Sequence, residues 1–185
     1  KQLENVYRSL GEMMKLSTDL TQNVGGLNRV LTNVKSRGTW AEVQLGNILD
    51  QTIPGMYETN VKTNPKYSGQ VEFAVRIPNA EDSSITWLPI DSKFPLEPYQ
   101  QLLDAYEKND PAEIAAAYKV LEARIKVEAK SIHDKYIEVP YTTDFAILFL
   151  PFEGLYSEAV NRGLVEVLQR EYHINIAGPS TMAAL

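Results

Sequence analysis

A run of six apolar residues does most to limit how this chain can fold. Residues 145–150 read Phe-Ala-Ile-Leu-Phe-Leu, without a polar side chain among them. A strand with one face in water alternates apolar and polar residues, whereas a strand buried on both faces has a continuous apolar pattern. Such strands occur in sheets that helices cover on both sides. The run therefore predicts an α/β protein.

A pair of antiparallel strands is predicted before this run. Residues 71–77 alternate, with Val71, Phe73, Val75 and Ile77 on one face and Glu72, Ala74 and Arg76 on the other. The polar residues 79–84 read as a hairpin loop, and residues 85–93 as the returning strand. Pro89 lacks a backbone N–H, which predicts a bulge or an edge position for the returning strand. Short strands are also expected at 57–62 and 174–177.

Helices fill most of the remaining chain. We expect Gly38 to end one helix and Thr39 to begin the next, over residues 40–49, because Thr39 and Glu42 have the spacing of a capping box. Further helices are expected at 95–108, at 111–137, as one element at 152–171, and from 179 onward. This order predicts a mixed sheet with helices on its faces.

The first part of the chain carries a heptad pattern. Apolar residues recur at spacings of three and four over residues 3–34: Leu3, Val6, Leu10, Met13, Leu20, Val24, Leu27, Leu31 and Val34. The pattern predicts a long amphipathic helix, either packed on its own domain or ending a coiled coil through which the chain self-associates. We therefore divide the chain into a coiled-coil-type helix at 1–36 and a core domain at 37–185.

Composition excludes several kinds of site. The chain has no Cys, which rules out disulfides, zinc–thiolate sites and a Cys nucleophile, and its two His make a His-rich metal site improbable. A net charge of −6 argues against a generic nucleic-acid binder but is compatible with a nuclease whose carboxylates hold a metal. No apolar run suits a membrane span and no signal peptide is visible, so we expect a cytoplasmic protein. The chain starts with Lys1, so we expect a fragment, with any membrane anchor outside it.

Four residues form a candidate catalytic site. Asp91 and Lys93 are two residues apart on a strand and so share a face, with Ser92 pointing away. Glu72 lies on the neighbouring strand and Glu42 on an earlier helix. Carboxylates suit Mg²⁺ or Mn²⁺, so Glu72, Asp91 and Glu42 would hold the metal while Lys93 orients water or stabilises charge. Each also has a structural alternative: a surface ion pair for Asp91 and Lys93, a half-exposed strand position for Glu72, and a helix cap for Glu42.

A family resemblance strengthens the site hypothesis. The order helix Glu, strand Glu, strand Asp-x-Lys matches the PD-(D/E)xK nucleases. The blocks 40–45, 71–78, 90–96, 135–136, 144–153 and 178–181 follow one another as in the RmuC family. The resemblance implies a restriction-endonuclease-like core, a role in DNA recombination, DNA as partner, and a coiled coil before the core. Two positions depart from the family pattern: Ala41 replaces the usual Gly, and Val71-Glu72 replaces Pro-Asp.

Three hypotheses for function follow. The first is a Mg²⁺-dependent DNA endonuclease, the second a catalytically silent DNA-binding or scaffolding module on the same fold, and the third a purely structural coiled-coil oligomer. Secondary candidates have simpler structural explanations: Glu153 as support for a helix start, residues 178–181 as an ordinary N-cap, and His133 as a helix residue at no ligand spacing.

Overall fold

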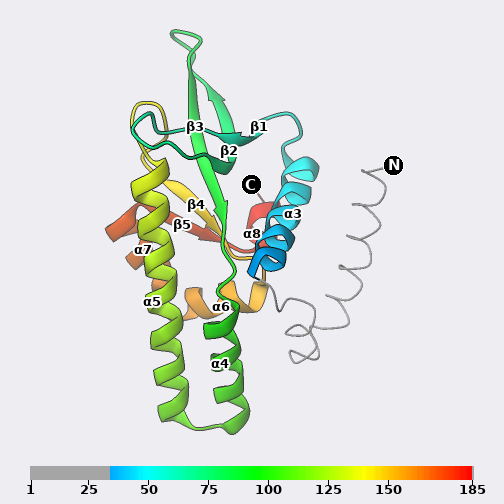
Figure 1. Cartoon of the computed structure of the whole chain (residues 1–185), viewed down its shortest axis with the longest axis vertical. Coiled ribbons are helices and arrows are strands. Elements are labelled where there is room, and N and C mark those ends of the chain that lie inside the picture. Colours follow the sequence, from blue (N-terminus) through cyan, green and yellow to red (C-terminus); the bar gives the residue numbers. More distant parts are fainter. Residues whose placement is uncertain (1–33, 185) are drawn as a thin grey trace. The chain divides into compact units, whose positions relative to one another are not determined.

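A mixed sheet of five strands, in the order β1-β2-β3-β4-β5, lies at the centre of the computed structural model, which describes residues 34–184 (Figure 1). Its strands are β1 (Tyr57–Val61), β2 (Val71–Pro78), β3 (Ile85–Ser92), β4 (Ala146–Phe149) and β5 (Ile174–Ala177). The first three are antiparallel, and β4 and β5 run parallel to β3. All five predicted strands are present.

Helices cover both faces of this sheet, which confirms the predicted α/β class. They are α3 (Val34–Thr52), α4 (Leu96–Lys108), α5 (Pro111–Tyr136), α6 (Glu153–Asn161), α7 (Leu164–Tyr172) and α8 (Pro179–Ala183). None of the helices in residues 34–184 combines the length and apolarity that a bilayer span needs. The heptad of residues 3–34 lies almost wholly outside the described residues, so the coiled coil stays a prediction.

The central strand β4 explains why the sheet is covered twice. Its side chains alternate between two buried clusters, because successive residues of a strand point to opposite faces. Leu148 packs with α5, α6 and α7, whereas Ile147 and Phe149 pack with α3 and α8. In Figure 1, α5 and α7 accordingly lie on one side of the sheet and α3 and α8 on the other. The continuous apolar run is thus shared between two cores.

Two predicted helix boundaries are wrong. Gly38 does not end a helix, because α3 continues through it from Val34 to Thr52. A single glycine inside a helix costs only about 1 kcal/mol, and α3 buries Trp40, Leu45 and Leu49 fully enough to offset that cost. Thr39 is therefore an interior helix residue, and Glu42 has no capping role.

The predicted helix at 152–171 is instead two helices, α6 and α7. The break falls at Gly163, whose φ of +75° belongs to the left-handed region that favours glycine. The Gly163 N–H still donates to the Val160 carbonyl at 3.1 Å, which closes the end of α6. The chain can therefore turn here and start α7 in a new direction.

Pro89 lies in an interior strand and pairs with Ala74 in an uninterrupted register, so both the predicted edge position and the predicted bulge are wrong. The N–H groups of Trp87 and Lys93 both donate toward the β4 side of β3, to Tyr141 and Phe149. The nitrogen of Pro89 faces that same side, because alternate N–H groups of a strand point the same way. Pairing with β4 begins only at Ile90, so the missing N–H leaves no β4 carbonyl without a partner.

Three aromatic rings join α3 to the carboxyl ends of β3 and β4. The ring of Trp40 lies 5.7 Å from that of Phe94 and 5.1 Å from that of Phe152, and these two lie 5.0 Å apart. Phe94 follows β3 and Phe152 follows β4, so the cluster fixes the ends of both strands. The candidate site residues Asp91 and Lys93 are at this end of the sheet.

Leu148→Ala should show how much the central strand contributes to the stability of the fold. Leu148 is fully buried in the cluster beneath α5, and truncating such a leucine typically costs about 2–5 kcal/mol of unfolding free energy. Urea denaturation followed by circular dichroism would measure the loss. The exposed Val120→Ala should stay within about 0.5 kcal/mol of the unaltered protein, and equal effects from the two changes would contradict the assignment of the core.

Candidate functional site

The site is built around Asp91, at the carboxyl end of β3. Asp91 is only 2% exposed, yet Nζ of Lys93 lies 3.1 Å from its Oδ2 atom. The two side chains share a face because they are two residues apart on one extended segment. Among the described residues, Oδ2 accepts no hydrogen bond of good geometry, so the contact is an ion pair alone. The structure thus brings Asp91 and Lys93 together.

Glu72 reaches the same place from the neighbouring strand. Phe73 pairs with Ile90 in the antiparallel register, and one further step places Glu72 opposite Asp91, on the same face. The pKa of Glu72 is raised to about 7, first by burial and then by the negative charge of Asp91, although hydrogen bonds from Ser92 oppose the rise. Two carboxylates are therefore held close together where water screens them poorly.

Burial shapes the ionisation of the other two groups. It raises the pKa of Asp91, and the positive charge of Lys93 only partly offsets this effect. Burial lowers the pKa of Lys93, but the charges of Asp91, Glu128 and Glu72 outweigh it, so that the net shift is upward. Lys93 therefore keeps its positive charge at neutral pH.

Ser92 belongs to the site, although we expected it to point away. Its N–H and its hydroxyl both donate to Oε2 of Glu72, at 3.1 and 2.7 Å. Glu72 has one methylene more than an aspartate, and these two bonds hold its carboxylate at the end of β3. The antiparallel register is what indicates this contact, because Ser92 follows Asp91, the residue opposite Glu72.

Helix α5 packs over this face of the sheet and adds Glu128 and Tyr136 to the site. Oε2 of Glu128 lies 4.0 Å from Nζ of Lys93. Oε1 of Glu128 forms an ion pair with Nε of Arg124 at 3.2 Å. Tyr136, two turns further on, has a pKa raised to about 12 by burial and by the charge of Asp91. Sequence reasoning missed Glu128 because its spacing to Arg124 is that of an ordinary surface pair on a helix.

Glu42 is not brought into direct contact with the other three. It comes from α3, which packs on the opposite face of the sheet through Leu45 and Leu49. Its charge adds a weak rise to the pKa of Glu72. Within residues 34–184, no three carboxylate or histidine side chains converge closely enough to form a metal site of their own.

Glu72 and Asp91 nevertheless suit a hard divalent cation. Both offer oxygen atoms, both have raised pKa values, and Asp91 Oδ2 lacks a hydrogen bond. Mg²⁺ keeps several waters and binds proteins through one or two carboxylates, so a third protein ligand is not required.

The secondary candidates have structural roles. Glu153 accepts a hydrogen bond from the Ser180 N–H and so ties the start of α6 to α8. Thr181 Oγ1 accepts from the Gly178 N–H at 3.0 Å, which closes the first turn of α8. His133 contacts Asp134, its neighbour on α5, at 3.0 Å.

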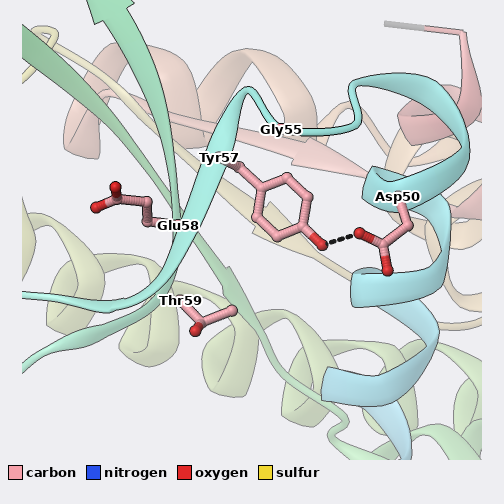
Figure 2. Close-up of a pocket in the computed structure, with 5 residues that line it drawn as sticks. All are labelled: Asp50, Gly55, Tyr57, Glu58 and Thr59. Carbon is pink, nitrogen blue, oxygen red and sulfur yellow. Dashed lines mark hydrogen bonds between the residues drawn. The ribbon is translucent and has the colours of Figure 1, made fainter.

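A separate open hollow lies beside the edge strand β1. Figure 2 shows the residues that line it, Asp50, Gly55, Tyr57, Glu58 and Thr59, and the Tyr57 hydroxyl donating to the Asp50 carboxylate. Arg76 also donates to the Gly55 carbonyl here. The Tyr57 and Asp50 side chains of the hollow are thus paired with each other.

Comparison with known proteins gives matches that all carry the same family name. The family model described as the RmuC family matches residues 1–185. Proteins named DNA recombination protein RmuC homolog in Xylella fastidiosa strains Temecula1 and 9a5c are 53% identical over 188 residues, covering 100% of this chain and 40% of their own length. The namesake in Chlamydia trachomatis is 29% identical over 184 residues, covering 95% of this chain and 39% of its own length. The chain thus spans about 40% of the length of these relatives. No solved structure matches it.

Glu72 should make the stability of the fold depend on pH. Its pKa is about 7 in the folded protein against an unshifted 4.5, so between these values the folded state holds a proton that the unfolded chain has released. The free energy of unfolding should then fall as pH rises through this window, by on the order of 3 kcal/mol, and level off above it.

Urea denaturation at about pH 5 and about pH 8 would measure this loss. Glu72→Gln, which cannot ionise, should show a smaller loss than the unaltered protein, while the rise in the pKa of Asp91 contributes to both. The exposed Glu58→Gln is the matched control and should retain the full pH dependence. Identical curves for all three proteins would contradict the placement of Glu72.

Proposed function

Because the chain belongs to the RmuC family of DNA recombination proteins, we propose that it acts on DNA, as an endonuclease that depends on Mg²⁺ or Mn²⁺. One observation carries the proposal. A buried aspartate lies beside an ammonium at 3.1 Å and opposite a carboxylate whose pKa is about 7. Perturbed ionisable groups gathered at one end of a sheet are typical of catalytic sites.

The two carboxylates would hold the metal. A bound Mg²⁺ lowers the pKa of a coordinated water and offsets negative charge on a phosphate. Glu72 and Asp91 would supply oxygen ligands, and Ser92 keeps the Glu72 carboxylate at the end of β3 through its two hydrogen bonds. Glu72 must be deprotonated to bind the metal. Because its pKa is about 7, it is mostly deprotonated only above neutral pH.

Lys93 would act on the phosphate. The Lys93 side chain is 36% exposed and the side chain of its partner Asp91 only 3%, so the ammonium lies between the buried carboxylate and solvent. In hydrolysis the water oxygen bonds to phosphorus, one phosphorus–oxygen ester bond breaks, the water gives up a proton and the leaving oxygen gains one. The Lys93 ammonium would donate to a phosphate oxygen as negative charge develops there.

Glu128 would act as a positioning residue. It lies 4.0 Å from Nζ of Lys93 and is itself held by Arg124. The ammonium thus lies between Asp91 and Glu128, which restricts the directions in which it can point. A fixed donor stabilises a developing charge better than a mobile one because less reorganisation is needed.

Lys93→Ala should abolish DNA cleavage without unfolding the protein. Supercoiled plasmid incubated with the protein and Mg²⁺ or Mn²⁺ would report nicking and linearisation on agarose gels. Removing the charge-stabilising donor should slow cleavage by about 100-fold or more. Lys108→Ala, at an exposed position on α4, is the matched control. Cleavage that survives Lys93→Ala unaltered would refute the assignment.

A catalytically silent DNA-binding or scaffolding module is the second candidate. Two observations favour it: Ser92 already engages one Glu72 oxygen twice, and the described residues contain no group of three metal ligands. The two proposals differ in what a metal should do to the folded protein.

Mn²⁺ should stabilise the folded protein if the site binds it. At a metal concentration one hundred times the dissociation constant, the free energy of unfolding should rise by about 2.7 kcal/mol. Thermal unfolding with and without Mn²⁺ would measure this rise, which Asp91→Asn should remove. A silent module should show no stabilisation that depends on Asp91, and that result would favour the second candidate.

A further inference from the structure

The turn between α5 and β4 exposes three apolar residues in a row. Val139 is 59% exposed and Tyr141 54%, and Pro140 between them is exposed as well. We call residues 139–141 the apolar tip. A single exposed apolar residue needs no explanation, but consecutive ones often mark a contact surface.

The backbone of the apolar tip is firmly held. The Glu138 N–H donates to Thr142 Oγ1 at 2.9 Å, and the Thr142 N–H donates back to the Glu138 carbonyl at 3.0 Å. Thr142 is itself only 2% exposed, and the Tyr141 carbonyl accepts from the Trp87 N–H at 3.0 Å. The tip therefore presents its side chains from a fixed turn.

Helix α5 connects the apolar tip to the candidate site. The same helix carries Glu128, 4.0 Å from Lys93, and ends at Tyr136, whose pKa is raised first by burial and then by the charge of Asp91. The tip begins three residues after that helix end. The Tyr141 carbonyl pairs with Trp87, six residues before Lys93 on one extended segment, so the tip lies roughly 20 Å from Lys93 along the sheet. A DNA strand of several nucleotides would span that distance.

A lysine on a second segment flanks the apolar tip. The loop after β1 is fixed to the end of α5 by hydrogen bonds from Thr63 and Asn64 to the Tyr136 and Lys135 carbonyls, at 2.8 and 3.1 Å. Figure 1 shows this loop beside the turn that follows α5. It carries Lys66, whose exposed ammonium lies 2.8 Å from Glu138, the residue just before the tip.

Aromatic rings continue this surface toward α5. The Tyr67 and Tyr136 rings lie 5.9 Å apart, edge to face, and Nζ of Lys135 lies 6.0 Å from the centre of the Tyr67 ring. Basic groups interleaved with aromatic rings are typical of surfaces that bind single-stranded nucleic acids. Lys66 and Lys135 together outweigh the charge of Glu138.

We propose that the apolar tip, with Lys66 and Lys135, binds an unpaired nucleotide of the DNA several nucleotides away from the phosphate at Lys93. The Tyr141 ring stacks on the base, and the two lysines face the neighbouring phosphates. The inference rests on the proposed function in placing the reacting phosphate at Lys93.

The exposed ring selects an unpaired nucleotide over a duplex. Lysines alone bind either form, because both carry phosphates. The face of a base becomes free for an aromatic ring only where the base has left the duplex stack. The ion pair of Lys66 with Glu138 is exposed and therefore weak, so a phosphate can replace the carboxylate.

Fluorescence anisotropy with labelled oligo-dT and with a blunt duplex tests the proposal. The full chain is used with EDTA present, so that neither metal nor cleavage enters the measurement. Tyr141→Ala should weaken oligo-dT binding by about fivefold or more, and duplex binding should change much less. Tyr141→Phe keeps the ring and should bind as the unaltered protein does.

Two further variants complete the experiment. Lys66→Gln should reduce the slope of log affinity against log salt concentration by about 0.7, the value for one phosphate contact on a single strand. Tyr106→Ala removes a tyrosine that is 39% exposed on α4 and should leave binding unchanged.

Several results would overturn the inference: no binding of oligo-dT by the unaltered protein, equal binding by all Tyr141 variants, or an equal loss on single strand and duplex. A Tyr141→Ala protein that dissociates in sedimentation while still binding oligo-dT would make the tip a contact between copies of the chain. Failure of the endonuclease proposal is seen separately, as cleavage that survives Lys93→Ala.

Discussion

The ion pair between Asp91 and Lys93 is the interaction on which the candidate site depends. A carboxylate that is 2% exposed loses most of its hydration, and a nearby ammonium recovers only part of that loss. A second carboxylate, Glu72, opposite Asp91 adds repulsion and has its own pKa raised to about 7. A fold selected for stability alone would not favour this arrangement. Its cost is easier to understand if a cation or a phosphate completes the site.

The mixed sheet makes this arrangement possible. Strand β3 is the one where pairing changes, because its neighbour β2 is antiparallel and its neighbour β4 is parallel. The carboxyl end of β3 therefore lies beside the beginning of β2, which supplies Glu72. Helix α5 then returns across the same face and supplies Glu128 and Tyr136. Residues from three distant parts of the chain thus meet at one strand end.

Local rules predicted much of this from the sequence. Alternation located β2, the polar hairpin loop after it located β3 as the returning strand, the continuous apolar run located β4, and the spacing of two placed Asp91 beside Lys93. The predictions failed where tertiary packing decides the outcome. Gly38 stays helical because α3 buries Trp40, Leu45 and Leu49 beyond it, whereas Gly163 breaks its helix by adopting a left-handed conformation. Glu128 could not be found, because its approach to Lys93 depends on how α5 lies over the sheet, and the sequence around it shows only a common helix pair.

The hydrogen bonds of Thr63 and Asn64 to the end of α5 have a consequence for binding energy. They fix a surface loop to the end of a long helix, so that Lys66 and Tyr67 are ordered before any ligand binds. A mobile loop would lose conformational entropy on binding, by about 0.5–1.5 kcal/mol for each side chain immobilised. Preorganisation of this kind lets a small contact area support useful affinity.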